Sequence, residues 1–195
     1  MGVLRNLGDR ACEQGAIMIP VRDPQLRIEL TRAIAEAALR QDSDWEYSRE
    51  LASWSGRGAT AVRGVPPADL PRGRQQYGDT VMRSFPDGWL SVEDGREHDA
   101  GELAVIATSS DDRLSRLRAG EAMSAVLLAA TSLNLASCPL SQPLEVDYTR
   151  RSIEERVLES AASPQIIIRL GWAPISSPDL AATPRLKLDE VLSFR

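Results

Sequence analysis

A single long apolar helix limits what this chain can fold into. Between Leu114 and Leu133 apolar side chains recur at helical spacing, and from Ala122 to Ala130 they surround nearly the whole helix. A helix that is apolar on most sides is buried on most sides, so we expect this one inside the core. Gly120 interrupts it at a cost of about 1 kcal/mol relative to alanine, which a closely packed neighbour would explain.

Shorter helices and strands are predicted around this helix. Clusters of β-branched residues predict strands at 15–21, 102–108 and 165–170. Helical spacing predicts helices that start at Asp23-Pro24 and Trp45, and a more polar helix at 150–160. We expect Ser109 or Ser110 to cap the long helix. Because helices and strands alternate only loosely, the pattern favours an α+β layer fold over a doubly wound sheet.

Three segments show neither the spacing of apolar residues typical of a helix nor the alternation typical of a strand. Residues 137–143 are rich in small and polar side chains and predict an irregular connection, and the tail at 183–192 is predicted to be extended. Residues 55–78 are rich in Gly, Pro and Arg and predict a long loop, a possible lid within a single domain of residues 1–195. A GxGxxA match at 56–61 lacks the preceding strand of a dinucleotide fingerprint, so we reject it.

Composition excludes several classes of function. The chain has 195 residues, with 23 basic and 28 acidic side chains, and a pI near 5.0 argues against nucleic-acid binding. No apolar run approaches the ~18–20 residues of a membrane span, and no signal peptide is visible, so we expect a cytoplasmic protein. His98 is the only histidine and Lys187 the only lysine. We therefore expect no Ser-His nucleophile, no phosphate-binding P-loop and no metal site.

Several sequence blocks occur in a fixed order along the chain. The strongest are RAGEAMSAVLLAATSLNLASCPLSQPLEV at 118–146, PQIIIRLGWAP at 164–174 and TPRLKLDEVL at 183–192. The shorter blocks SRELASW, GVP and ATSSDD agree with them at 48–54, 64–66 and 107–112. Together these blocks, which span most of the chain, resemble the second half of the Acg-type, dormancy-associated branch of the nitroreductase superfamily.

This resemblance implies a nitroreductase-like three-layer α-β-α sandwich that binds FMN. It also implies hydride transfer from NAD(P)H to a nitro or quinone acceptor. In the family, a loop after the long helix wraps the isoalloxazine ring, mainly with backbone atoms, and a basic residue near the C-terminus meets the phosphate. The matching positions in this sequence are Pro139, Leu140, Ser141 and Gln142 for the ring, and Arg185 with Lys187 for the phosphate. A plain surface arginine is the alternative role for Arg185.

The chain also departs from the family pattern. Family members begin with segments of the types RAPSxHNTQPW and RRTxRRPF, and neither string occurs here. We therefore expect this chain to match the C-terminal portion of the family architecture, with a partial fold. We expect a homodimer, or association with the missing half. Besides an oxidoreductase, the sequence allows a flavin-sequestering protein covered by residues 55–78, or a remnant that has lost its cofactor.

Overall fold

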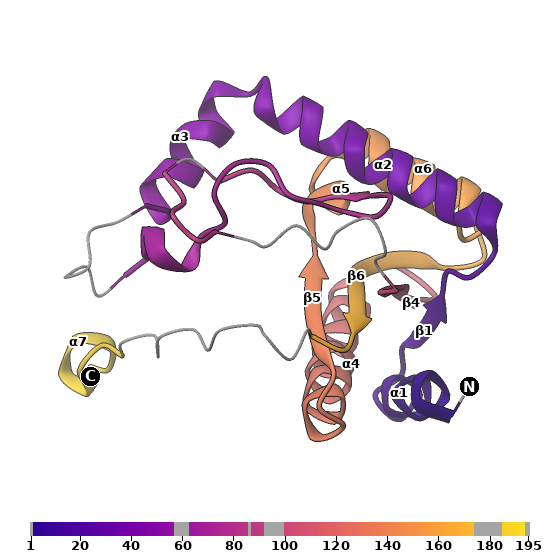
Figure 1. Cartoon of the computed structure of the whole chain (residues 1–195). Coiled ribbons are helices and arrows are strands. Elements are labelled where there is room, and N and C mark those ends of the chain that lie inside the picture. Colours follow the sequence, from indigo (N-terminus) through magenta and orange to yellow (C-terminus); the bar gives the residue numbers. More distant parts are fainter. Residues whose placement is uncertain (1, 57–62, 86, 92–99, 174–184, 194–195) are drawn as a thin grey trace.

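The centre of the molecule is a four-stranded antiparallel sheet in the order β1-β4-β6-β5 (Figure 1). The computed structural model describes residues 2–56, 63–85, 87–91, 100–173 and 185–193. The strands are β1 (Ile17–Pro20), β4 (Glu102–Thr108), β5 (Ala136–Leu140) and β6 (Ser163–Gly171). All three pairings are antiparallel, which confirms the predicted α+β class and excludes a doubly wound sheet.

Alternation along β4 buries both faces of the sheet. Leu103, Val105 and Ala107 belong to one apolar cluster, whereas Ala104 and Ile106 belong to a second cluster on the opposite face. All five side chains are fully buried. Since successive residues of a strand point to opposite faces, a continuous apolar run such as ELAVIAT requires a cover on each side.

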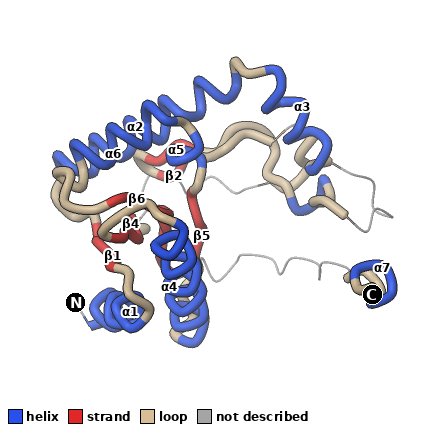
Figure 2. The backbone as a smooth tube through the Cα atoms, turned by 180° about the vertical axis from the view of Figure 1, so that it is seen from behind, coloured by secondary structure: helices blue, strands red, loops and turns tan. Residues whose placement is uncertain are grey.

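Two layers of helices provide these covers (Figures 1 and 2). The first cluster packs under α2 (Pro24–Asp42), α5 (Gln142–Glu145) and α6 (Asp147–Arg156). The second packs under α1 (Gly2–Glu13) and α4 (Arg113–Ser132). The arrangement is the predicted three-layer α-β-α sandwich.

Side-chain caps explain where the helices begin. Asp23 Oδ1 accepts hydrogen bonds from the backbone N–H groups of Gln25 and Leu26, so α2 starts at Pro24 as predicted. Asp44 caps α3 (Trp45–Trp54) in the same way. The predicted serine cap of α4 is wrong. Asp112 Oδ1 accepts from Ser115 N at 2.8 Å and is the cap, while the Ser110 hydroxyl donates to Asp112.

Other expectations need correction. Residues 136–140 form strand β5 and 142–145 form α5, where we expected an irregular connection. The tail forms a short helix, α7 (Leu188–Val191), and α1 was not predicted. The described part of the expected 55–78 loop contains a 3-10 turn, η1 (Pro67–Asp69), and strand β2 (Gln76–Tyr77). Strand β2 pairs with β3 (Thr80–Val81) in a small hairpin.

The long helix α4 is buried on one face only, which corrects the expectation of burial on most sides. Ala119, Ala122, Val126 and Ala130 face the core. The opposite face carries leucines at helical spacing that are largely exposed, at 54% for Leu114, 60% for Leu117 and 70% for Leu128. A Cβ added at Gly120 would meet nothing within 4 Å, so the close neighbour that we expected there is not found in the described chain.

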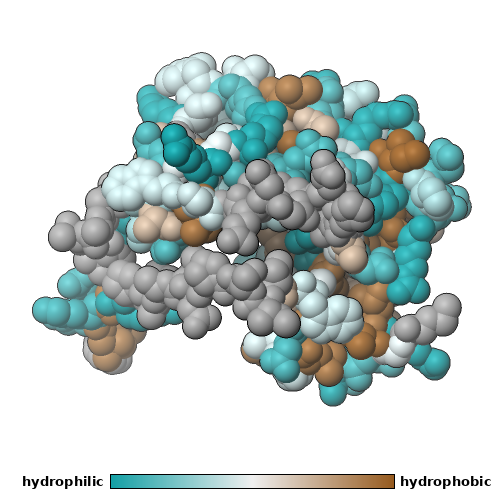
Figure 3. Space-filling model, in the orientation of Figure 1, coloured by the Kyte–Doolittle hydropathy of each residue, from teal (hydrophilic) through white to brown (hydrophobic). Residues whose placement is uncertain are grey.

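Apolar side chains also gather elsewhere on the surface. Figure 3 shows hydrophobic side chains on the part of the molecule where Figure 1 places α1 and α4, and again on α7. On the C-terminal segment Leu188, Val191 and Leu192 are exposed.

Within the described residues, no helix is long and apolar enough to cross a membrane.

Asp111, just before α4, connects the start of this helix to α6 and to strand β6. Its carboxylate accepts hydrogen bonds from Arg116 at 2.9 and 3.0 Å, from Arg150 of α6 at 3.2 Å and from Gln165 of β6 at 3.0 Å. These partners, Arg116 first and then Gln165 and Arg150, lower the pKa of Asp111 from 3.8 to about 2. A carboxylate held in its charged form stabilises the fold above its unfolded pKa and loses that effect as the pH falls.

We expect Asp111→Asn to remove stability that depends on pH. Between pH 5 and 8 the variant should lose about 1 kcal/mol of unfolding free energy, a value reduced for the solvent screening of a partly exposed pair. The difference from the wild type should shrink as the pH falls from about 4 toward 2, where the wild-type carboxylate also becomes neutral. Urea denaturation at a series of pH values measures this, and a constant difference across the series would contradict it.

Candidate functional site

The predicted ring-binding segment forms the end of an edge strand. β5 is the last strand in the sheet order and pairs on one side with β6, where Pro139 lies opposite Ile168. Proline is tolerated at such an edge because its missing N–H removes no hydrogen bond from the centre of a sheet. The outer edge of β5 therefore presents backbone groups that a ligand can use.

The side chains of this segment are divided between the core and the surface. Leu140 is buried against the first core cluster, and Gln142 is buried with its Nε2 donating to Gln41 Oε1 at 2.7 Å. Pro139 and Ser141 are exposed. The structure thus brings the four predicted ring residues together, and it leaves the backbone, Pro139 and Ser141 as the parts that face outward.

A carboxylate that the sequence did not single out holds this turn. Glu145, at the end of α5, accepts hydrogen bonds from Ser141 Oγ at 2.6 Å and from Gln41 Nε2 at 2.7 Å. The Arg83 guanidinium, beyond β3, donates to both Glu145 oxygens at 3.0 Å. Burial alone raises the pKa of Glu145, but the donors from Ser141, Gln41 and Arg83 together bring this pKa below its ordinary value.

Among the described residues, two buried side-chain polar atoms have no hydrogen-bond partner. The Tyr47 ring lies under the Arg83 guanidinium, 5.5 Å from its carbon to the ring centroid, and the buried Tyr47 hydroxyl is unpaired. Burial, the largest effect, raises the pKa of Tyr47, and the charge of Glu145 adds to it. Gln75 Oε1 is the second unpaired atom. Buried polar atoms are nearly always satisfied, so a small polar group such as water is expected to complete this region.

The predicted phosphate residues lie elsewhere in the described chain. Arg185 and Lys187 are exposed and immediately precede α7. Both views of the backbone show α7 well apart from β5 and α5 (Figures 1 and 2). Within one chain, the structure therefore does not bring these basic residues together with the β5–α5 turn.

The described part of the predicted lid is fixed to α2 by ion pairs. Arg27 of α2 donates to both oxygens of Asp79, at 2.6 and 2.9 Å, in the turn between β2 and β3. Arg74 pairs with Asp42 at the other end of α2. The hairpin accordingly runs beside α2 and reaches the β5–α5 turn (Figure 1). Its role as a cover stays a prediction, and residues 57–62 lie outside the described chain.

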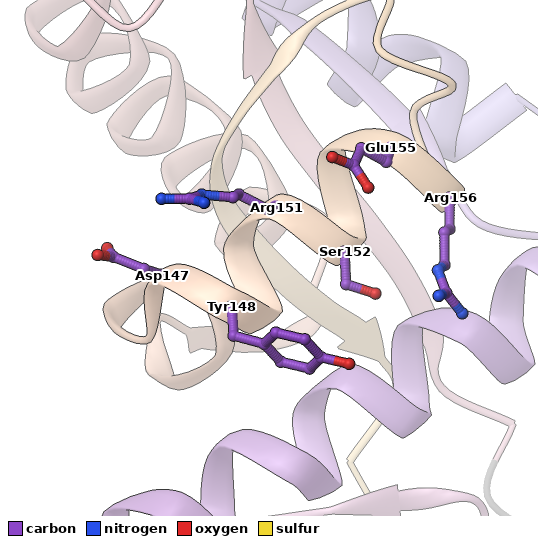
Figure 4. A pocket seen from close by; sticks show the side chains of 6 residues that line it. All are labelled: Asp147, Tyr148, Arg151, Ser152, Glu155 and Arg156. Atoms are coloured by element: carbon purple, nitrogen blue, oxygen red, sulfur yellow. The ribbon is translucent and has the colours of Figure 1, made fainter.

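A polar groove of about 400 Å³ lies on α6 (Figure 4). Two acidic and two basic side chains line it together with Tyr148 and Ser152. Arg156 pairs there with Glu29, and Arg40 lies over the Tyr148 ring. Its charges balance, so it resembles an ordinary surface groove more than the largely apolar pocket of an organic cofactor.

The expectations on metals and on histidine chemistry concern residues that are only partly described. Across the described ranges, no cluster of three or more His, Cys, Asp or Glu side chains could hold a metal ion. His98 lies outside those ranges.

Comparison with known proteins decides the family. The model of the nitroreductase family matches residues 22–172. The chain belongs to this family. The matched part runs from α2 to the end of β6 and includes α4, β5 and the β5–α5 turn.

Two relatives from Mycobacterium tuberculosis are similar in sequence. A protein provisionally named an NAD(P)H nitroreductase is 41% identical over 169 residues, which cover 83% of this chain and 47% of the relative. A second, provisionally named NAD(P)H nitroreductase Acg, is 33% identical over 182 residues, covering 92% of this chain and 54% of the relative. The chain therefore spans about half the length of these relatives.

Solved structures confirm the nitroreductase-like fold. The iodotyrosine deiodinase bound to FMN and 3-iodo-L-tyrosine superimposes with a TM-score of 0.57 at 14% identity, covering 98% of this chain and 89% of that structure. The FMN-dependent nitroreductase NfnB of Mycobacterium smegmatis, in complex with NADPH, gives a TM-score of 0.54 at 13% identity. That match covers 99% of this chain and 87% of NfnB.

Proposed function

We propose that this protein is an FMN-binding oxidoreductase that passes hydride from NAD(P)H to a nitro or quinone acceptor, as a member of the Acg-type branch. The observation that carries the proposal is the family match over residues 22–172, which includes the β5–α5 turn. The names of the mycobacterial relatives, NAD(P)H nitroreductases, agree with it. The FMN bound to the superimposed deiodinase and the NADPH in complex with NfnB agree with it as well.

The residues around the turn suit the chemistry of FMN. A flavin ring needs hydrogen-bonding groups for its carbonyls and nitrogens, and the outer edge of β5 offers backbone groups at Pro139 and Ser141. The phosphate needs positive charge, and a guanidinium can bind it through two hydrogen bonds. Within one chain Arg185 and Lys187 lie apart from the turn, so in this proposal they supply that charge from the C-terminal segment of the second copy in a dimer. The buried Tyr47 hydroxyl, whose ring lies under Arg83, has no hydrogen-bond partner among the described residues, which supports a further polar group near the turn.

In this proposal the flavin supplies the hydride chemistry, and the protein binds and orients it. The backbone at Pro139–Gln142 orients the ring, while Arg185 and Lys187 hold the phosphate. The scarcity of histidine and lysine in the chain is compatible with this division of roles, because no protein nucleophile or general base is required.

We also propose that two copies of the chain associate through the exposed face of α4. Leu114, Leu117 and Leu128 form a leucine stripe on the side of α4 opposite the core, which exposed Glu121 and Ser124 interrupt between Leu117 and Leu128. Gly120 on the same helix leaves open space for a second backbone. Exposed apolar side chains gathered on one helix face mark interaction sites, and a second copy offers a self-complementary partner for them.

The first test is cofactor binding with turnover. FMN titrated into the purified protein should lose fluorescence, and the loaded protein should oxidise NADPH or NADH only when a nitroaromatic or quinone is present. FMN binding without turnover would support a flavin-sequestering protein instead. Protein that leaves FMN fluorescence unchanged would indicate a remnant without cofactor and would overturn the proposal.

The second test addresses the phosphate. Arg185→Ala should weaken FMN binding by about 1.5–3 kcal/mol, the scale of a hydrogen bond to a charged group, which is roughly a ten- to hundredfold rise in Kd. Riboflavin, which lacks the phosphate, should bind both proteins equally. Arg10→Ala, on α1, is the matched control. Equal FMN affinity in Arg185→Ala and wild type removes Arg185 from the site.

The third test addresses self-association. Leu128→Arg should raise the dissociation constant of the dimer about tenfold or more, since it removes an apolar contact and places a charge on the stripe. Leu39→Arg, at a leucine on α2 that is 60% exposed, is the control and should leave the dimer intact. Sedimentation velocity over a concentration series measures both. A wild type that stays monomeric throughout would refute the interface.

A further inference from the structure

We infer that Glu145 is a positioning residue for the flavin, an inference that rests on the proposed function. Its carboxylate fixes the β5–α5 turn to two other elements and so sets where the outward-facing backbone of Pro139–Ser141 lies. The residue itself is not placed at the reacting atoms.

The first step is the number and origin of its hydrogen bonds. Within the turn, Ser141 Oγ donates to Oε1 at 2.6 Å, so the short helix α5 is closed by a side-chain bond between residues four apart. Gln41 donates to Oε2 from the last turn of α2, a contact across 104 residues of sequence. Arg83 donates to both oxygens from the segment that leaves the β2–β3 hairpin.

The second step is the coupling between these bonds. Gln41 donates to Glu145 through Nε2 and accepts from Gln142 Nε2 through Oε1, both at 2.7 Å. Since a glutamine amide has one acceptor oxygen and one donor nitrogen, the Glu145 contact fixes which way Gln41 faces. That orientation in turn gives Gln142 its buried acceptor. Loss of the carboxylate therefore affects two turn residues, Ser141 directly and Gln142 through Gln41.

The third step is the size of the effect. The Glu145 side chain is 38% exposed, so solvent screens its ion pair with Arg83. Glu145 belongs to neither of the two apolar clusters that pack against the sheet. The stability of the fold therefore depends less on Glu145 than on the buried side chains of β4. Its removal should loosen the turn and leave the sheet intact.

The decisive variant is Glu145→Ala. In FMN-free protein, amide exchange in a peptide covering 139–145 should become at least tenfold faster, while peptides from β4 and β6 exchange as in the wild type. The Kd for FMN should rise about tenfold, and the visible circular dichroism of the bound flavin should change, because ring orientation alters it. Glu36→Ala, which also removes a glutamate paired with an arginine, should change none of these.

The conservative variant Glu145→Gln separates positioning from simple packing. It keeps Oε1 for Ser141 but presents an amide to Gln41 Nε2, where two donors then face each other. We expect partial rescue, with a Kd about threefold above that of the wild type and a dichroism spectrum close to it. This variant carries the test if Glu145→Ala does not fold.

The outcomes are distinguishable. A wild type that does not bind FMN overturns the proposed function and this inference with it. A wild type that binds, together with a Glu145→Ala protein of equal affinity and unchanged dichroism, overturns the inference alone. Faster exchange that extends equally through β4 and β6, with no rescue by glutamine, shows a general loss of stability and also overturns it.

Discussion

The burial of β4 on both faces is the constraint on which the remaining architecture depends. Its run of seven residues has six buried side chains, and the five apolar ones alternate between two clusters, so each face of the sheet requires a helical layer. α2 and α6 cover one face, and α1 and α4 cover the other. With the two inner positions of the sheet taken by β4 and β6, strands β1 and β5 become its edges. The free edge of β5, where the candidate site lies, is a consequence of this order.

Strong local sequence signals were sufficient to predict where several helices and strands begin. Helix α2 begins at the predicted Asp23 cap, α3 begins at Trp45 as its apolar spacing predicts, and ELAVIAT forms β4 with the predicted bounds. α1 was missed although Leu7 and Ala11, four residues apart, are both buried on one helical face. β5 could not be predicted from ASCPL, since small residues and proline have low strand propensity and the strand forms by pairing with β6. The faces of α4 also escaped prediction, because apolar residues lie on both of them.

In the candidate site, too, some residues could be named from the sequence and others could not. The resemblance supplied Pro139–Gln142 as a loop, and in the structure these residues run from the end of edge strand β5 into α5; their role at a flavin ring stays a prediction. Glu145, Gln41 and Arg83 carry no motif. Their contacts join residues 62 and 104 positions apart, so they exist only once the layers have formed. The one local signal was the spacing of Ser141 and Glu145, which are four residues apart on a helical turn.

Pro139 gives the outer edge of β5 a property that edge strands without proline lack. An unprotected edge is a template for another strand, and therefore a starting point for chain-to-chain aggregation. A proline contributes no N–H, so an incoming strand would find its ladder of hydrogen bonds broken at that position. A small planar molecule needs only a few backbone groups and tolerates the gap. The edge of this strand can thus bind a small planar molecule while it resists pairing with a strand of another chain.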